Sequence, residues 1–238
     1  MKNRVNAFVA AAVLICLVPA AAFALAPYAQ TFESLNAADP GALAADGWLV
    51  FGNVFNPGGG YLYGYGVFPA PNGTGAFCAI AVGEGGPGQG AQQLVVFSDY
   101  NNADHANGNL IEANVFQEQL VGAGSVGQTW TFQFDAKRGN LAGATTALAF
   151  IKTLDPNNGY QTTNFITVNT TAIPTTWNAY SLSITITANL ATQILQIGFA
   201  STATHYEGSG IFYDNINFHQ GAVATESTTW GGVKALFE

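Results

Sequence analysis

The chain has 238 residues, of which only 8% are charged, and its formal net charge is −8. An acidic chain of this kind repels phosphate backbones, which excludes nucleic acid as a predicted partner. Acidic polysaccharides would also be repelled unless a cation bridges them. Neutral glycans and divalent cations are therefore the ligands that the charge favours.

The N-terminal 26 residues are predicted to be a secretory signal peptide. Two basic residues precede the apolar run Ala7–Val18, and small residues follow it. This order is typical of a cleaved export signal, and the run is short for a membrane span. Cleavage is predicted after Ala24 or after Ala26, with Pro27 disfavouring the second. The remaining chain has four basic and fourteen acidic residues, so its net charge is −10.

Cys78 is the only cysteine outside the predicted signal peptide, so no intramolecular disulfide is expected. The fold must then be stabilised by its core, and about 200 residues suffice for one sizeable core. Because apolar residues flank Cys78, we interpret it as a small buried hydrophobic residue rather than a reactive thiol.

Strand patterns dominate the chain after the signal peptide. Thr129–Lys137 alternates strictly between apolar and polar residues, which is the period of a half-buried strand. The other predicted strands are Gln92–Phe97, Leu110–Gln117, Ala144–Thr153, Asn164–Asn169, Tyr180–Ile186, Ile194–Phe199 and Ile211–Phe218. This pattern predicts an all-β fold, an antiparallel β-sandwich of jelly-roll type, over residues 27–221.

Two segments differ from the strand pattern. Residues 58–90 are rich in glycine, proline and aromatic residues, and we interpret them as a long excursion from the sandwich. Residues 222–238 are predicted to be a C-terminal tail that is polar at first and then apolar. This tail is either a docking or sorting signal or a frayed chain end.

One acidic residue lies near each end of the predicted sandwich. Glu33 lies within Thr31–Ser34, and Asp214 lies within Ser209–Phe218. The first and last strands of a β-sandwich are often neighbours, so the two carboxylates are predicted to meet at one Ca²⁺ ion, which prefers oxygen ligands. The alternative is that both are solvated residues at strand edges.

Three segments carry a family resemblance, namely Phe32-Glu33, Trp130–Lys137 and Tyr213–Ile216. They resemble the jelly-roll, galactose-binding-like carbohydrate-binding modules of secreted bacterial proteins. The resemblance covers about Gln30 to Phe218 and includes no diagnostic catalytic motif. It implies a structural calcium ion held by Glu33 and Asp214. The excursion at residues 58–90 departs from the family pattern.

Aromatic residues form the predicted ligand-binding set, because sugar rings stack their C–H faces on aromatic planes. In an extended segment, Tyr61, Tyr63 and Tyr65 would share one side. The alternative is that these rings pack on the sandwich as a lid. The residues of the set are Trp48, Tyr61, Tyr63, Tyr65 and Tyr100, with Phe51 and Phe55 beside them.

The loop Asp99–His105 is dense in oxygen atoms but lacks the spacing of a helix-loop-helix calcium loop. A solvated loop with Asx turns is favoured over a second ion site. Catalytic motifs are absent from the sequence. The least improbable catalytic cluster is His205-Tyr206-Glu207, for which a surface loop is the simpler interpretation.

These observations predict a secreted, non-catalytic protein similar to carbohydrate-binding modules. It would bind a glycan at the cell surface or in the extracellular matrix, with the periplasm as an alternative location. Two other functions remain open from the sequence. One is a structural or adhesive protein without a defined sugar site, and the other is a polysaccharide-degrading enzyme.

Overall fold

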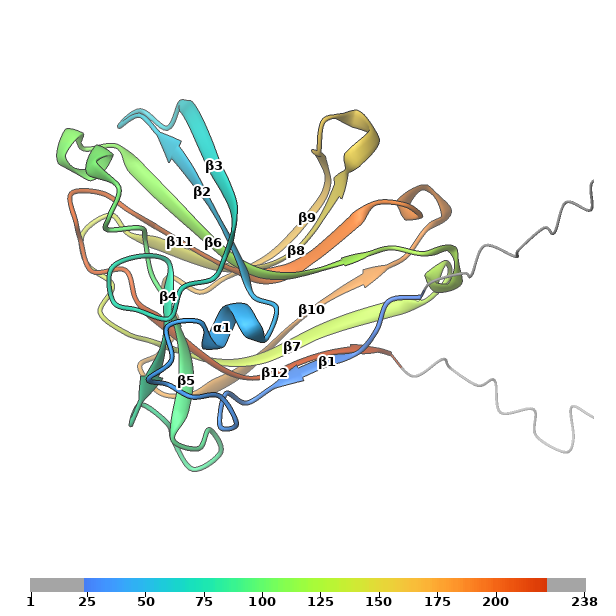
Figure 1. The fold of residues 1–238 in the computed structure, drawn as a ribbon, viewed down its shortest axis with the longest axis horizontal. Helices are drawn as coiled ribbons and strands as arrows, with labels where there is room; N and C mark the ends of the chain where they lie inside the picture. Colours follow the sequence, from blue (N-terminus) through green and yellow to red (C-terminus); the bar gives the residue numbers. More distant parts are fainter. Residues whose placement is uncertain (1–23, 222–238) are drawn as a thin grey trace, which may run out of the picture.

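The computed structural model describes residues 24–221, which form two facing antiparallel sheets (Figure 1). Sheet A has the strand order β10-β7-β12-β5-β4, and β1 also pairs with β12. Sheet B has the order β3-β2-β6-β11-β8-β9. The predicted all-β antiparallel sandwich is confirmed.

The elements have the following bounds. Sheet A contains β1 (Tyr28–Gln30), β4 (Cys78–Val82), β5 (Gln92–Val96), β7 (Thr129–Arg138), β10 (Asn178–Thr185) and β12 (Ile211–Gln220). Sheet B contains β2 (Leu49–Phe55), β3 (Tyr61–Pro69), β6 (Leu110–Leu120), β8 (Thr146–Asp155), β9 (Gln161–Asn169) and β11 (Ile194–Ala203). The short helices are α1 (Ala42–Ala45), η1 (Ala103–Asn107), η2 (Ala123–Ser125), η3 (Pro156–Asn158) and η4 (Ala188–Leu190). None of these helices has the length and apolar character needed to cross a membrane.

The core fills the space between the two sheets. Along β7 the burial alternates, so that Phe132 and Phe134 point inward as their sequence pattern predicts. They meet Phe199 of β11, whose ring stacks on that of Tyr213 of β12 at 3.6 Å between ring centroids. Each such aromatic side chain stabilises the fold by about 1.5–3 kcal/mol through burial. Cys78 is also completely buried, as its apolar neighbours predict.

Sheet B is apolar on its outer face as well. Phe116, Phe150 and Ala200 form a second, smaller buried cluster there, separate from the core between the sheets. The run Ala147–Ile151 is apolar on both sides because Ala147, Ala149 and Ile151 face the core between the sheets, while Leu148 and Phe150 belong to the outer cluster.

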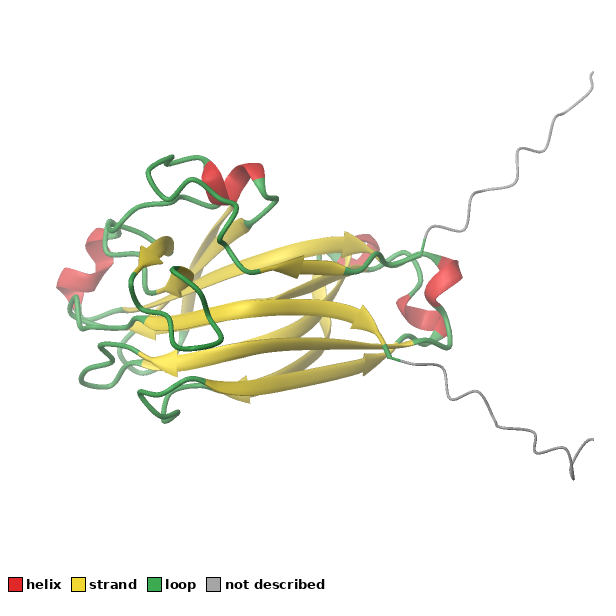
Figure 2. Ribbon diagram, turned by 90° about the horizontal axis from the view of Figure 1, so that it is seen from below, coloured by secondary structure: helices red, strands yellow, loops and turns green. Residues whose placement is uncertain are grey.

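The first and last strands are neighbours, as predicted. Tyr28 of β1 lies opposite Phe218 of β12 in antiparallel register. Both ends of the described chain consequently lie at the same end of the sandwich (Figures 1 and 2).

The described chain begins inside the predicted signal peptide, most of which lies outside the described residues, as does the predicted tail 222–238. The side chain of Leu25 belongs to the core, and its N–H donates to Ser125 Oγ at 2.7 Å. Cleavage after Ala24 keeps these contacts, whereas cleavage after Ala26 would remove them. The sandwich therefore starts at Leu25, two residues earlier than the sequence predicts.

Residues 58–90 are not an excursion from the sandwich. They contain β3, which pairs with β2 at one edge of sheet B, and β4, which pairs with β5 in sheet A. Glycine and proline are depleted in strands, so their abundance here hides the pairing potential in the sequence.

Candidate functional site

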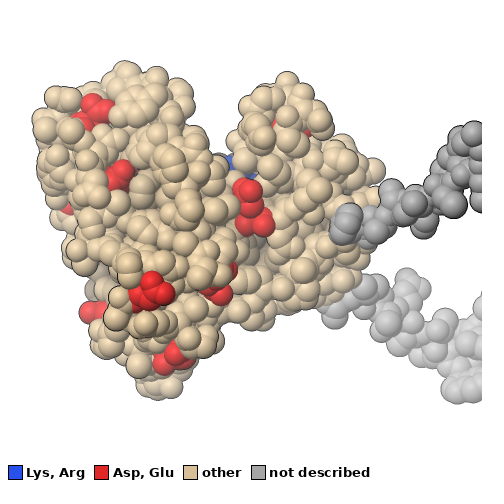
Figure 3. Space-filling model, in the orientation of Figure 1, with Lys and Arg blue, Asp and Glu red and all other residues tan. Residues whose placement is uncertain are grey.

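The outer face of sheet B is concave. Strands β2 and β3 rise on one side of it and strands β8 and β9 on the other (Figure 1). The space-filling view shows a notch between two lobes, with acidic and basic atoms inside it (Figure 3). We call this surface the notch; its residues point outward from β2, β3, β6, β11, β8 and β9.

Polar side chains hold one another in place at the base of the notch. Glu112 of β6 accepts two hydrogen bonds at Oε1, from Asn53 Nδ2 at 2.8 Å and from Asn114 Nδ2 at 2.9 Å. Asn114 also donates to the carbonyl oxygen of Phe51. These bonds fix the side chains before any ligand arrives.

A second polar group lies on the same face, beyond Phe116 along β6. Gln196 of β11 lies opposite Glu118 on one side and Lys152 on the other, and it donates to Glu118 Oε2 at 3.0 Å. Gln196 Oε1 is buried and has no hydrogen-bond partner within residues 24–221. Burial lowers the pKa of Lys152, and the nearby charge of Glu112 opposes this shift. Lys152 Nζ also lies 4.8 Å from the centre of the Phe150 ring.

An exposed aromatic ring stands on each side of the notch. Tyr61, on edge strand β3, is 61% exposed and packs against Phe55 at 5.8 Å between ring centroids. Phe165, on edge strand β9, is 52% exposed and packs against Phe150 at 6.0 Å. The notch thus combines two exposed aromatic rings with a floor that has a polar group on each side of an apolar cluster.

The three tyrosines of β3 do not share one side, contrary to the prediction. A bulge in the pairing of β2 with β3 lies between Val54, which is opposite Tyr63, and Phe55, which is opposite Tyr61. The extra residue shifts the alternation, so Tyr61 faces the notch while Tyr63 and Tyr65 face the other side of the sheet.

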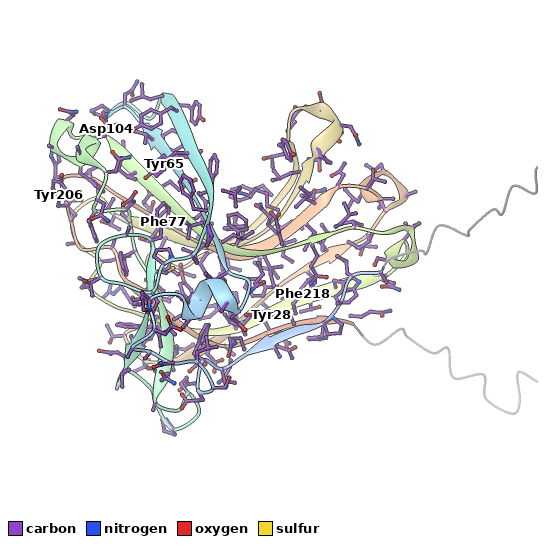
Figure 4. The ribbon with its side chains drawn as sticks, viewed as in Figure 1. Tyr28, Tyr65, Phe77, Asp104, Tyr206 and Phe218 are labelled. Atoms are coloured by element: carbon purple, nitrogen blue, oxygen red, sulfur yellow. The ribbon has the colours of Figure 1, made fainter. Side chains whose placement is uncertain are left out.

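The hydroxyl groups of Tyr63 and Tyr65 bind the loop before β6. Figure 4 labels Tyr65 and, on this loop, Asp104. Tyr63 donates to Asp104 Oδ2 at 2.5 Å, and Tyr65 donates to Asp99 Oδ2 at 2.7 Å. The Tyr65 ring also meets the edge of Phe77. This is the packing as a lid that is the alternative to ligand binding, and both hydroxyl groups are engaged within the protein.

Trp48 and Tyr100 also lie away from the notch. Trp48 is completely buried and packs on Phe199 in the core, so it has no ring face for a ligand. Tyr100 stacks on Phe97 at 5.8 Å, and its hydroxyl donates to the carbonyl oxygen of Glu207. Of the five predicted ligand-binding residues, Tyr61 alone faces the notch, together with the neighbouring Phe51 and Phe55 of β2.

The loop containing Asp99 and Asp104 uses its oxygens internally. Asn102 caps η1 by accepting from the N–H of Asp104 at 2.9 Å, and Asp99 Oδ1 accepts from the N–H of Asn101. These are the Asx turns that the sequence favours over a second ion.

The two terminal acids lie in the same region, on the outer side of sheet A, but their roles differ. Glu33 Oε1 accepts from the N–H groups of Ala91 at 2.7 Å and Gln92 at 2.6 Å, so it holds the segment before β5. Asp214 has no exposed surface, and its Oδ2 has no partner in the described part of the chain. Burial, and secondarily the charges of Glu33 and Asp135, raise the pKa of Asp214 to about 7.

The surroundings of Asp214 fit a hard divalent cation. Gln93 Oε1 is a second buried oxygen without a partner, because the Gln93 amide donates to the carbonyls of Gln89 and Gly90. Calcium binds carboxylate, amide and carbonyl oxygens of this kind. Residues 24–221 contain no group of three or more His, Cys, Asp or Glu residues arranged to hold a metal. An ion here would therefore need amide, carbonyl or water oxygens in addition to carboxylates.

Sequence reasoning missed Gln93 and Asp135 at this site. Asp135 lies directly opposite Asp214 in the pairing of β7 with β12. Its Oδ2 accepts from Gln89 Nε2 at 2.8 Å and from Asn215 Nδ2 at 2.7 Å. The strict alternation of β7 shows which face Asp135 occupies but not which strand lies beside it.

Comparison with known proteins gives similar folds only. No family model matches the chain, and no curated protein matches it. Similar solved structures include the enzymatically active domain of tailspike protein 4 of bacteriophage CBA120, with 17% identity and a TM-score of 0.44 over 79% of this chain. The chain spans 22% of the length of that tailspike chain.

Two other similar structures are matched over most of their own length. A cyclase from Fischerella sp. TAU has 13% identity and a TM-score of 0.45, covering 80% of this chain and 93% of the cyclase. The CBM22-1 xylan-binding domain from Paenibacillus barcinonensis has 7% identity and a TM-score of 0.38, covering 60% of this chain and 80% of that domain. Carbohydrate-binding modules are thus among the similar folds, as the sequence resemblance predicts.

Proposed function

We propose that this protein binds a neutral glycan in the notch on the outer face of sheet B and that it does so without catalysis. One observation carries the proposal. Two hydrogen-bonded polar groups lie in the floor of the notch, Glu112 with Asn53 and Asn114, and Gln196 with Glu118, and they flank the apolar cluster of Phe116, Phe150 and Ala200 on the face that also carries the exposed rings of Tyr61 and Phe165. Aromatic faces suit the C–H surface of a sugar, and fixed polar groups suit its hydroxyls.

The charges of the notch favour an uncharged ligand. Glu112 and Glu118 lie in its floor, and Lys152 is the basic residue beside them. The chain after the predicted signal peptide carries a net charge of −10, which adds a general repulsion of anions.

Removing one aromatic wall tests the location of the site. We expect Phe165→Ala and Tyr61→Ala each to weaken binding at least about tenfold, which corresponds to about 1.4 kcal/mol of binding free energy. The measurement is affinity electrophoresis in gels that contain xylan, mixed-linkage β-glucan, mannan or galactan, followed by titration calorimetry.

Tyr206→Ala is the matched control, because Tyr206 is an exposed aromatic that packs on His105 at the loop end of the molecule (Figure 4). It should bind like the native protein. Native affinity in Phe165→Ala would show that the notch is not the site, and a native protein that binds none of the four glycans would contradict the function. Release of reducing ends from a bound glycan would instead indicate an enzyme.

A second proposal concerns stability. We propose that Asp214 and Gln93 hold a structural Ca²⁺ ion, with Glu33 and Asp135 supplying negative charge nearby. Two buried oxygens without partners support it, and a bound cation would stabilise a fold for which no disulfide is expected.

A further inference from the structure

A second hollow lies on the outer face of sheet A, the sheet opposite the notch. It is a cavity of about 620 Å³. Its floor follows one register row across three strands, in which Phe212 of β12 lies opposite Val95 of β5, and Val95 lies opposite Ala79 of β4. The small side chain of Ala79 leaves the space open. We call this hollow the sheet A cavity.

The walls of the sheet A cavity are largely apolar and aromatic. Phe97 and Tyr100 stack almost in parallel at its edge, with 7° between their ring planes. Phe212 supplies a further ring from the floor. The Tyr100 hydroxyl is already engaged by Glu207 and Ser209, and its ring packs on those of Phe97 and His105, so Tyr100 forms a fixed apolar wall and the ring of Phe212 is the one placed for stacking.

The charge at the rim of the cavity is balanced. Glu84 accepts from Lys137 Nζ at 2.8 Å, and this ammonium group lies 5.0 Å from the centre of the Phe212 ring and 5.4 Å from that of Trp177. Because the carboxylate is already paired with a cation, the cavity favours neither an anionic nor a cationic ligand.

Hydrogen-bonding groups of both kinds remain at the rim. Asn140 accepts from the N–H of Gly210 at 2.9 Å through Oδ1, and its Nδ2 donor is without a partner among the described residues. Glu84 retains acceptor capacity at its second oxygen, since only Oε2 contacts Lys137. A volume of this size lies within the range of small-molecule sites, which combine apolar walls with a few polar groups.

We propose that the sheet A cavity is a second saccharide site, which takes one or two uncharged pyranose units through ring stacking and hydrogen bonds at the rim. The choice of a saccharide rests on the proposed function of the notch. Since the two sites lie on the outer faces of opposite sheets, one molecule can hold two glycan chains at once. The protein would then cross-link a polysaccharide as well as bind it.

Filling the cavity tests the proposal. Ala79→Phe and Ala81→Phe each place a ring in the hollow, and neither residue belongs to the core between the sheets. Ser183→Phe is the matched control, because Ser183 is exposed on β10 and lines neither cavity nor notch. Thermal melting shows which variants are folded.

The measurement is the number of sites per chain in titration calorimetry with xylohexaose, cellohexaose and mannohexaose. We expect two sites in the native protein and in Ser183→Phe, one in Ala79→Phe and Ala81→Phe, and in Phe165→Ala one site of native affinity beside one that is at least about tenfold weaker. Mixtures of the native protein with the matching polysaccharide should become turbid, and the cavity-filling variants should abolish this turbidity.

A native protein with one site that only Phe165→Ala removes would overturn this proposal and leave the notch intact. A single site that only the cavity-filling variants remove would overturn the notch and leave the sheet A cavity as the glycan site. The two proposals therefore fail in different, recognisable ways.

Discussion

Asp214 is the residue whose protonation state bears most directly on stability. Its pKa is raised to about 7 by burial and by the charges of Glu33 and Asp135, whereas an unfolded aspartate titrates near about 3.9. In the absence of a cation, the folded protein holds this proton more tightly than the unfolded chain. The stability gained in this way is complete below about pH 4 and is lost as the pH rises through about 7.

We therefore expect the melting temperature of the chelated protein to be lower at pH 8 than at pH 5.5. Calcium competes with the proton for the same carboxylate, so added Ca²⁺ should raise the melting temperature more at pH 8 than at pH 5.5. Differential scanning calorimetry in EDTA and in Ca²⁺ at both pH values measures this.

Asp214→Asn is the matched control for the calcium prediction. The amide has the shape of the acid but no charge, so this variant should lose the calcium response and much of the pH dependence. If Asp214→Asn responds to EDTA as strongly as the native protein does, the ion is bound elsewhere.

At the scale of the element, the bulge in β3 decides which tyrosines can meet a ligand. Tyr65→Phe should lower the free energy of unfolding by about 1–2 kcal/mol, because Asp99 loses a partly buried hydrogen bond. Tyr63→Phe should cost less, since its bond to Asp104 is exposed to water. Urea denaturation measures both values.

Neither substitution should change glycan affinity, because both tyrosines face away from the notch. Tyr61→Ala, on the same strand, should in contrast weaken glycan binding. A folded Tyr63→Phe or Tyr65→Phe variant that no longer binds glycan would show that the side of β3 facing the loop carries the site.

The elements that could be predicted from sequence are those with strict alternation. The alternation of β7 correctly predicts which of its residues are buried. The sequence also predicts β12 as a strand, but a bulge between Asp214 and Asn217 changes its alternation, so that Ile216 and Phe218 face the core together with Ile211 and Tyr213. β3 could not be predicted in this way, because glycines interrupt its pattern and the position of its bulge depends on the partner strand. Strict alternation therefore predicted, wrongly, that Tyr61 lies on the same side of the strand as Tyr63 and Tyr65.

The candidate sites were predictable only in part, for the same reason. The closeness of Glu33 to Asp214 could be predicted because the first and last strands of a sandwich are often neighbours. The notch, in contrast, joins Asn53, Glu112, Lys152 and Gln196, which come from four strands that are distant in the sequence. Only the register of sheet B shows that Asn53 lies opposite Glu112, that Gln196 lies opposite Lys152, and that both pairs belong to the same outer face.

At the scale of the whole molecule, the salt dependence of the affinity distinguishes binding of a neutral glycan from binding of a charged ligand. A neutral glycan held by stacking and hydrogen bonds should bind with nearly the same affinity at 50 mM and 500 mM NaCl, with a change below about twofold, because salt screens only charged partners. Titration calorimetry at the two salt concentrations measures this. A tenfold loss at high salt would indicate an ionic ligand instead.

The pairing of β1 with β12 also determines how the domain can be connected to anything else. Because the described chain enters and leaves at one end of the sandwich, both outer faces stay clear of whatever is joined to either terminus. A short linker from residue 221 to residue 24 would close the chain into a ring, so new ends could be opened at a turn such as Pro156–Asn158. The same arrangement would let the whole domain be inserted as a cassette into a surface loop of another protein.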